Sequence, residues 1–158
     1  MTGFGELKKT AKNNPRMEGD IYRGFFLSNA YHGKGYFKKR DSEGNHLYDY
    51  IGYFEEGLKH GNGYAFYSKG DQSPDEWEKG TWRFDQKDGV FLRTVTDGFV
   101  IVGKYRVEYD KGRVGRKEEI KKPDVDDFPI GRKVSSFFSN MMHRLKESVR
   151  LNQKLIVF

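Results

Sequence analysis

The feature that most constrains this chain is an internal repeat with a period of 28 residues. Residues 22–24 read Tyr-Arg-Gly and residues 50–52 read Tyr-Ile-Gly, while residues 32–35 and 60–63 both read His-Gly-x-Gly. The two pairs of segments keep the same frame, which is not expected by chance. The middle of the chain is therefore predicted to contain tandem copies of one small structural unit.

Two further copies follow with weaker matches. A second step of 28 residues leads to Gly80 and Trp82, and a last step of 23 residues leads to Gly103 and Tyr105. In this alignment one position is aromatic in every copy, and its members are Phe26, Phe54, Trp82 and Tyr105. The sequence thus predicts about four copies within residues 22–118.

Aromatic and glycine residues alternate within each copy. Tyr22, Gly24 and Phe26 are two residues apart, the spacing that places side chains on one face of a β-strand. A glycine between two rings leaves a gap on that face, and a neighbouring ring can cover it. The His-Gly-x-Gly half predicts the return strand, with glycines where the backbone bends tightly. Each copy is therefore predicted to be a β-hairpin, and the residues expected to maintain it are Tyr22, Gly24, Phe26, His32, Gly33, Gly35, Tyr50, Gly52, Phe54, His60, Gly61, Gly63, Gly80, Trp82, Gly103 and Tyr105.

Turn signals separate the predicted strands. Asp97-Gly98 lies between two β-branched or aromatic runs and is the strongest hairpin turn signal in the chain. The polar segments 39–46 and 69–76 hold the additional residues of the longer copies. Both segments are expected to be loops at the same edge of the sheet.

Few but large apolar side chains are available for a core. Only 35% of the 158 residues are hydrophobic, but 16% are aromatic and 19 residues are glycine. This balance favours strands and turns over a helical bundle, which would use more Ala, Leu and Glu. The predicted fold is a mainly β, single-layer antiparallel meander of hairpins followed by a C-terminal amphipathic α-helix. Its expected parts are an N-terminal extension at 1–21, the hairpin array at 22–118, a linker at 119–133, and the helix with its tail at 134–158.

Apolar residues near the C-terminus recur at helical spacing. Their stripe contains Val134, Phe137, Phe138, Met141, Met142, Leu145 and Val149. An amphipathic helix of this kind has three open interpretations. It covers the aromatic face of its own sheet, it inserts into the groove of a partner, or it lies on an anionic membrane.

The glycine and histidine motif resembles a known repeat. The pattern Tyr-x-Gly, three or four residues, Gly, two residues and His-Gly-x-Gly is similar to the MORN repeat, and residues 50–63 fit it at every position. Residues 22–35 depart from it at Asn29, where the pattern has glycine, and the later two copies match in part. The resemblance covers roughly residues 22–114. It implies a single-layer meander of hairpins and a role as a scaffold or targeting module, found at membrane junctions, in cytoskeletal assemblies, or fused to lipid kinases or a lysine methyltransferase.

The sequence offers little for catalysis or metal binding. It contains no cysteine and four histidines, of which His32 and His60 belong to the repeat. Equivalent positions in successive hairpins are two strands, about 10 Å, apart. Zinc–ligand bonds are about 2 Å long, so these two histidines cannot share a zinc ion. Each is expected to bond to backbone at a turn. We predict no catalytic residue, no metal ligand and no cofactor. A hydrolase that uses Glu55, Glu56 or His60 is the third hypothesis for function.

The face opposite the recurring aromatic residues of the repeat is also apolar in the first two copies. A single-layer sheet that is hydrophobic on both faces needs a cover from its own termini or from another molecule. The residues predicted to bind a partner are Phe25, Leu27, Ile51, Tyr53, Phe137, Phe138, Met141, Met142 and Leu145.

These observations predict a non-catalytic, protein-binding adaptor or scaffold. Its partner is another protein, or a second copy joined at an open sheet edge as a homodimer. The formal charge of +6 favours anionic partners, so the alternative is peripheral binding to anionic membrane lipid through the basic surface and the C-terminal helix. Basic clusters are scattered and lack interleaved stacking rings, which argues against nucleic acid. Since no apolar run approaches the ~20 residues of a membrane span and residues 1–15 lack a signal-peptide core, a cytoplasmic or membrane-peripheral location is expected.

Overall fold

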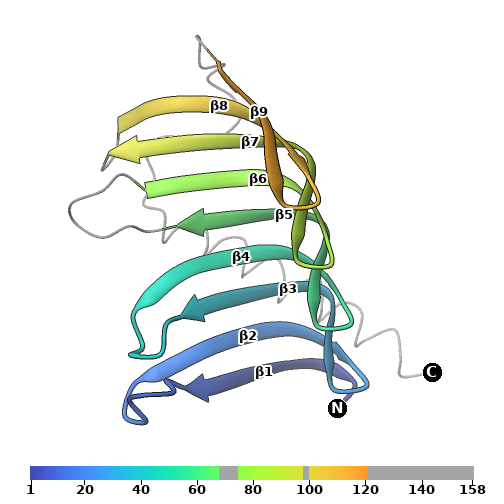
Figure 1. Ribbon diagram of the computed structural model, residues 1–158. Helices are drawn as coiled ribbons and strands as arrows, with labels where there is room; N and C mark the ends of the chain where they lie inside the picture. Colours follow the sequence, from blue (N-terminus) through green and yellow to red (C-terminus); the bar gives the residue numbers. More distant parts are fainter. Residues whose placement is uncertain (68–74, 98–99, 121–158) are drawn as a thin grey trace. The chain divides into compact units, whose positions relative to one another are not determined.

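The structure, a computed structural model, describes residues 1–67, 75–97 and 100–120 of the chain. Nine strands form one antiparallel sheet in which each strand pairs with the next along the chain (Figure 1). Their bounds are β1 Gly3–Thr10, β2 Glu18–Leu27, β3 Ala30–Arg40, β4 His46–Glu55, β5 Leu58–Tyr67, β6 Asp75–Arg83, β7 Gln86–Asp97, β8 Val100–Asp110 and β9 Arg113–Glu119.

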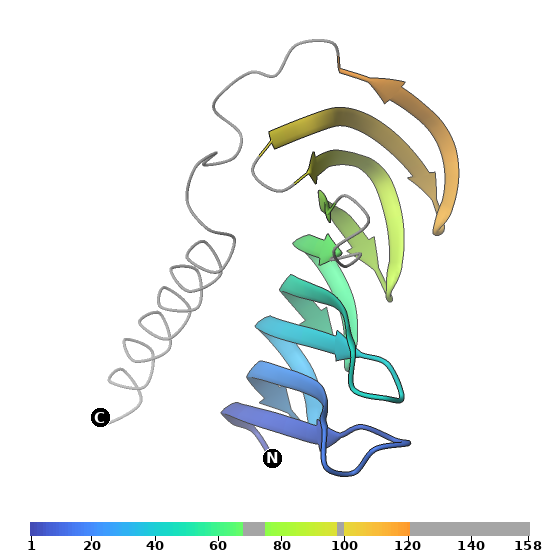
Figure 2. The ribbon, with the colours of Figure 1, turned by 90° about the vertical axis from the view of Figure 1, so that its left-hand side faces the viewer.

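This arrangement confirms the predicted mainly β, antiparallel meander. Four hairpins, β2–β3, β4–β5, β6–β7 and β8–β9, follow one another in a single layer (Figure 2). Asp97 pairs with Val100, so β7 and β8 are antiparallel neighbours on either side of the predicted turn, whose residues 98–99 lie outside the described chain. The predicted C-terminal helix at 134–158, its partner-binding residues and most of the linker at 119–133 lie outside the described residues. Within the described part of the chain, no helix is long and apolar enough to cross a membrane.

The sheet begins earlier than the predicted array. Residues 1–21 were expected to precede the hairpins, but β1 pairs with β2 in a register that places Gly5 opposite Gly24. The Tyr-x-Gly motif is absent from β1, so the repeat does not reveal this strand. It adds backbone hydrogen bonds to the free edge of β2, and the sheet therefore extends from Gly3 to Glu119.

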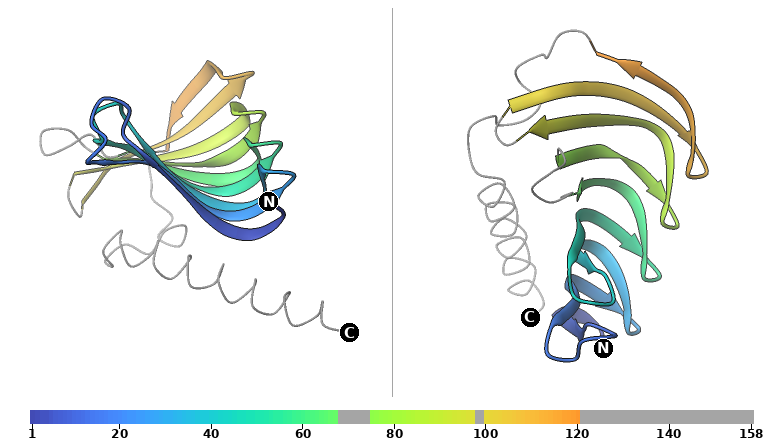
Figure 3. Two further views of the ribbon diagram at one scale, coloured as in Figure 1. Left: turned by 90° about the horizontal axis from the view of Figure 1, so that it is seen from below. Right: turned by 60° about the vertical axis from the view of Figure 1, so that its left-hand side comes forward.

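One face of the sheet, here called the aromatic face, carries a continuous ring core. The ring of Tyr50 lies 5.2 Å from that of Phe54 and 5.0 Å from that of Trp82, both edge-on. Trp82 continues the series to Phe91 at 4.7 Å. The strands curve and twist along the array (Figure 3), and every residue of this core is at most 7% exposed although the sheet has one layer. Its members are Tyr22, Phe26, Tyr50, Phe54, Ala65, Trp82, Phe91, Val107 and Tyr109.

The predicted covering of glycine by an aromatic ring is confirmed. A Cβ added to Gly52 would lie 2.3 Å from the Tyr50 hydroxyl, and one added to Gly63 would lie 2.5 Å from it. Tyr22 covers Gly24 and Gly35 in the same way. Each tyrosine covers the glycine two residues later on its own strand and the glycine opposite it on the next strand. The Tyr50 hydroxyl donates a hydrogen bond to the Tyr53 carbonyl at 3.2 Å.

The hairpin turns lie along one edge of the sheet, here called the tip edge (right in Figure 1). Each turn has two central residues with positive φ, as in type I′ hairpins, and the second of them is Asn29, Gly57, Asp85 or Gly112. The amide of that residue donates to the preceding hairpin or to the N-terminal residue, for example from Gly57 to the Tyr31 carbonyl at 2.9 Å and from Gly112 to the Lys87 carbonyl at 2.8 Å. This series of hydrogen bonds fastens neighbouring tips together.

The same turn positions correct the predicted register of the fourth copy. Trp82 pairs with Lys87 just before its turn, and Tyr109 pairs with Val114 in the same place. The last step is therefore 27 residues from Trp82 to Tyr109, not 23 to Tyr105. Tyr105 takes the place of Tyr22 and Tyr50, and Val107 replaces the glycine. Gly103 resembles the repeat glycine in residue type but lies at a different distance from its turn, and equivalent positions are those at the same distance from the turn.

Candidate interaction surface

Large apolar side chains are exposed on the face opposite the aromatic face, close to the tip edge. We call these five residues the tip patch: Phe25 (36% exposed), Leu27 (49%), Tyr53 (44%), Leu58 (38%) and Phe84 (50%). The alternation of β2 and β4 puts Phe25 and Tyr53 on this face, because Phe26 and Phe54 point into the aromatic core. Phe25, Leu27 and Tyr53 were predicted to bind a partner, whereas Leu58 and Phe84 were not predicted.

The tip patch is continuous across several strands. Phe4 on β1 lies edge-on to Phe25, with ring centroids 6.4 Å apart. Tyr53 stands directly opposite His60 in the register of β4 and β5, and the His60 ring lies 4.8 Å from that of Phe84. A row of rings and aliphatic side chains therefore runs from β1 to the turn between β6 and β7.

Phe84 has a backbone conformation that its side chain disfavours. It is the first central residue of its turn, with φ of 47°. A bulky residue is an outlier in this region, which asparagine, aspartate and glycine adopt at lower cost. Phe84-Asp85 lies 28 residues after Glu56-Gly57, so the repeat period could have placed Phe84 in a turn. That assignment becomes clear only once the turns are located in the structure.

The repeat histidines lie beside the tip patch. His32 stands opposite Phe25 and His60 opposite Tyr53, each two residues or more inside its strand. They were expected to be turn residues bonding to backbone. His60 Nε2 lies 3.3 Å from Glu55 Oε2 at a solvent-exposed hairpin end, and its Nδ1 is buried without a hydrogen-bond partner. Among the described residues, no group of three or more histidines and carboxylates could hold a metal ion.

Two lysines border the patch without a carboxylate partner in the described chain. Lys34 is exposed, and its ammonium lies 5.5 Å from the centre of the Tyr53 ring. Lys79, also exposed, lies 5.6 Å from the Tyr64 ring. Arg23 differs from both, since it forms an ion pair with Glu6. Lys34, directly opposite Tyr53, and Lys79, level with Ile51, therefore add positive charge to the surface around the patch.

Ile51 lies apart from the tip patch. It was predicted with Tyr53 as an exposed contact, but only 6% of it is exposed. Ile51 stands between Tyr36 and Tyr64 in the strand register, and it belongs to a set of buried apolar residues on this face. The other members are Ile21, Tyr36, Phe66 and Trp77. Alternation thus identified the face of Ile51 and not its exposure.

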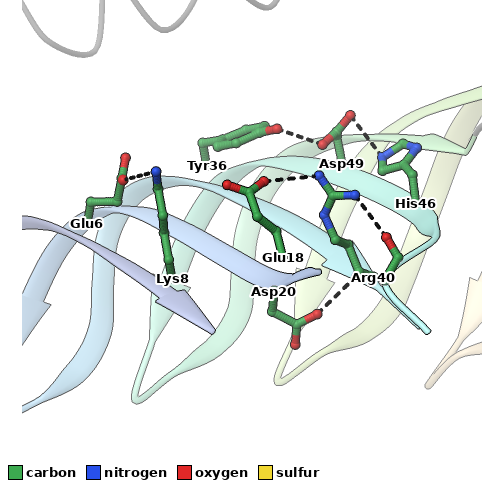
Figure 4. Close-up of polar contacts among 9 residues, drawn as sticks. Glu6, Lys8, Glu18, Asp20, Tyr36, Arg40, His46 and Asp49 are labelled. Atoms are coloured by element: carbon green, nitrogen blue, oxygen red, sulfur yellow. Dashed lines mark hydrogen bonds and ion pairs between the residues drawn. The ribbon is translucent and has the colours of Figure 1, made fainter. Parts of the chain in front are cut away.

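Buried polar contacts organise the edge opposite the tips (Figure 4). The Tyr36 hydroxyl donates to Asp49 Oδ1 at 2.7 Å, and His46 Nε2 lies 3.1 Å from Asp49 Oδ2, outside hydrogen-bond geometry. Burial alone would raise the pKa of Asp49, but the nearby His46 and the Tyr36 hydroxyl outweigh it and hold the pKa below its usual value. Arg40 donates to the Gly44 carbonyl at 2.9 Å and so fastens the β3–β4 loop. We assign these contacts to stability.

A buried carboxylate replaces the repeat tyrosine in the third copy. Glu78 is 1% exposed on the aromatic face, where it forms ion pairs with Lys87 and Arg93. Burial would raise the pKa of Glu78, but the two cations outweigh it and lower the pKa. Phe91 then supplies the ring that covers Gly80. The Tyr109 hydroxyl also donates to the carboxylate at 3.2 Å, and we assign this cluster to stability.

Fold and surface together define a β-hairpin repeat protein with an apolar, partly basic patch along its tips. No protein-family model matches the chain, and no curated protein sequence matches it. The resemblance to MORN repeats therefore stays a prediction based on the motif.

Proposed function

We propose that this protein is a non-catalytic adaptor or scaffold that binds another protein through the tip patch. The observation that carries the proposal is the gathering of five exposed, large apolar side chains at three successive hairpin ends. Contiguous apolar surface of this kind is characteristic of interaction sites. The hydrogen bonds between tips hold these side chains on a rigid support, which lowers the entropy lost on binding.

Phe84 gives independent support. Its backbone has a positive φ that a bulky side chain disfavours, and half of its ring stays exposed beside His60. Strained residues of this kind often occur at binding sites. We therefore expect Phe84→Asn to raise the melting temperature by about 3 °C, since asparagine relieves roughly 0.5–1 kcal/mol of strain. The same change is expected to weaken partner binding.

The test is proximity crosslinking of the full chain in its native host, followed by quantitative mass spectrometry. Tyr53→Ser and Phe84→Asn should each lose the same set of crosslinked proteins. Leu47→Ser is the matched control, because Leu47 is 43% exposed and lies outside the patch. Retention of every crosslinked protein by both patch variants would refute the proposal.

Peripheral binding to anionic membranes is the second candidate. The observation that favours it is that Lys34 and Lys79 have no carboxylate partner in the part of the chain that the structure describes. Against it, Glu55, Glu56 and Asp85 stand at the same tips and would face anionic head groups. Flotation with phosphatidylserine vesicles separates the two candidates. Salt-sensitive flotation that survives Tyr53→Ser would favour the membrane.

Self-association at an open sheet edge is part of the same proposal, and the edges of β1 and β9 are the open positions in the described sheet. Sedimentation equilibrium of the full chain measures this directly. A concentration-independent monomer would remove the homodimer from the proposal.

A further inference from the structure

The spacing of the tip patch restricts the shape of its partner. Phe25 and Tyr53 occupy equivalent places two strands apart, which corresponds to about 10 Å. Phe84 follows at the next tip along the array. Seven residues of an α-helix rise about 10.5 Å. A helix that crosses the strands therefore presents one apolar residue to each tip if its apolar positions recur every seven residues.

Other forms of partner fit this row less well. An added strand would pair with β1 or β9 at the ends of the array and would not contact successive tips. A flat lipid surface would bring the acidic tip residues, Glu55 and Glu56, against anionic head groups. A helix avoids both conflicts, because it touches only a narrow strip of the face.

Charge restricts the partner further. Lys34 stands directly opposite Tyr53 in the register of β3 and β4, and Lys79 stands opposite Tyr64, level with Ile51 and nearer the middle of the sheet. Neither lysine has a carboxylate partner within the described chain, and each ammonium lies near a tyrosine ring. A row of acidic residues on the flank of the helix would complete both pairs. The chain's own C-terminal stripe is flanked mainly by basic residues, with Arg144, Lys146 and Arg150 against Glu147, so a row of acidic residues is not present there.

From these observations we infer that the tip patch accepts an amphipathic α-helix of another protein, with apolar residues at heptad spacing and acidic residues on the flank toward Lys34 and Lys79. This inference rests on the proposed function and names its partner class.

The test uses two synthetic helical peptides of about 21 residues, three heptads, with identical apolar positions. One has glutamate on the flank and the other has lysine. Binding of each fluorescent peptide to the full chain is measured by anisotropy at low and high salt. The acidic peptide is expected to bind about fivefold more tightly, from two solvent-exposed ion pairs, and high salt should reduce the difference.

Variants of the chain complete the design. Phe84→Asn and Tyr53→Ser should weaken both peptides, whereas Leu47→Ser should weaken neither. The double change Lys34→Glu with Lys79→Glu should reverse the preference, while Lys12→Glu, in the loop after β1, should leave it unchanged. Circular dichroism melts of each variant verify that it folds.

Equal affinity for the two peptides would overturn the charge assignment, and the absence of binding by either peptide would overturn the helix. Neither result alters the crosslinking experiment, which tests the proposed function with native proteins. Capture of phosphatidylserine vesicles in preference to both peptides would replace the helix by a membrane as the partner.

Discussion

The contact between Tyr50 and its glycines makes a quantitative prediction for Gly52→Ala. The new Cβ would lie 2.3 Å from the Tyr50 hydroxyl, 2.6 Å from its Cζ and 2.8 Å from the Asn62 carbonyl oxygen. Two of these contacts involve a fully buried ring, and the third involves backbone, so none is relieved by a flexible side-chain end. The ring must move away from Phe54 and Trp82, its edge-on neighbours.

Overpacking of a well-packed core costs about 1–3 kcal/mol. Displacement of a fully buried ring approaches the cost of removing it, about 3–5 kcal/mol. We therefore expect Gly52→Ala to lower the free energy of unfolding by about 3 kcal/mol, measured by urea denaturation. In a folded unit of this size the melting temperature should fall by about 10 °C.

Gly115→Ala is the matched control. Gly115 lies in β9 without a positive φ, and the nearest atom to an added Cβ is the Glu108 carbonyl oxygen at 3.5 Å. This change is expected to alter stability by less than about 0.5 kcal/mol. A double-mutant cycle adds a second criterion, since Gly52→Ala should cost little once Tyr50→Ala has removed the ring. Equal effects of the two glycine changes, or strict additivity in the cycle, would refute the packing argument.

Two further predictions concern buried carboxylates. Glu78→Gln should lower the free energy of unfolding by about 3 kcal/mol, because it leaves Lys87 and Arg93 without their counter-charge, whereas Glu56→Gln at an exposed tip should have no measurable effect in the same urea titration. The lowered pKa of Asp49 stabilises the fold fully above its ordinary value of 3.8, and this contribution is lost as the pH falls through the folded-state pKa. Asp49→Asn should therefore be less stable than the wild type near neutral pH and should show a shallower loss of stability in acid. A parallel decline of both proteins would contradict the assignment.

Local patterns in the sequence were sufficient for the hairpins and their faces. Period-two alternation places Tyr22, Gly24 and Phe26 on one face, because successive side chains of a strand point in opposite directions. The need for glycine beside a buried ring follows from the same spacing. The exposure of Phe25 and Tyr53 could also be anticipated, since they lie near turns on the other face.

Contacts between strands decided the rest. The sequence did not reveal β1, the register of the fourth copy or the burial of Ile51, since each depends on the neighbours that pairing supplies. Glu78 appeared to be a defect in the repeat until pairing brought Lys87 and Arg93 to its carboxylate.

For the tip patch, too, local sequence patterns determined one part and contacts between strands the other. The sequence by itself determined that strands alternate, that hairpins repeat and that rings cover glycines, because these properties depend on residues close together along the chain. Only the tertiary structure decided that Leu58 and Phe84 join Tyr53, and that Lys34 and Lys79 contact tyrosine rings and have no carboxylate partner among the described residues. Burial and charge pairing depend on distances across the sheet, which the spacing of residues along the chain does not specify.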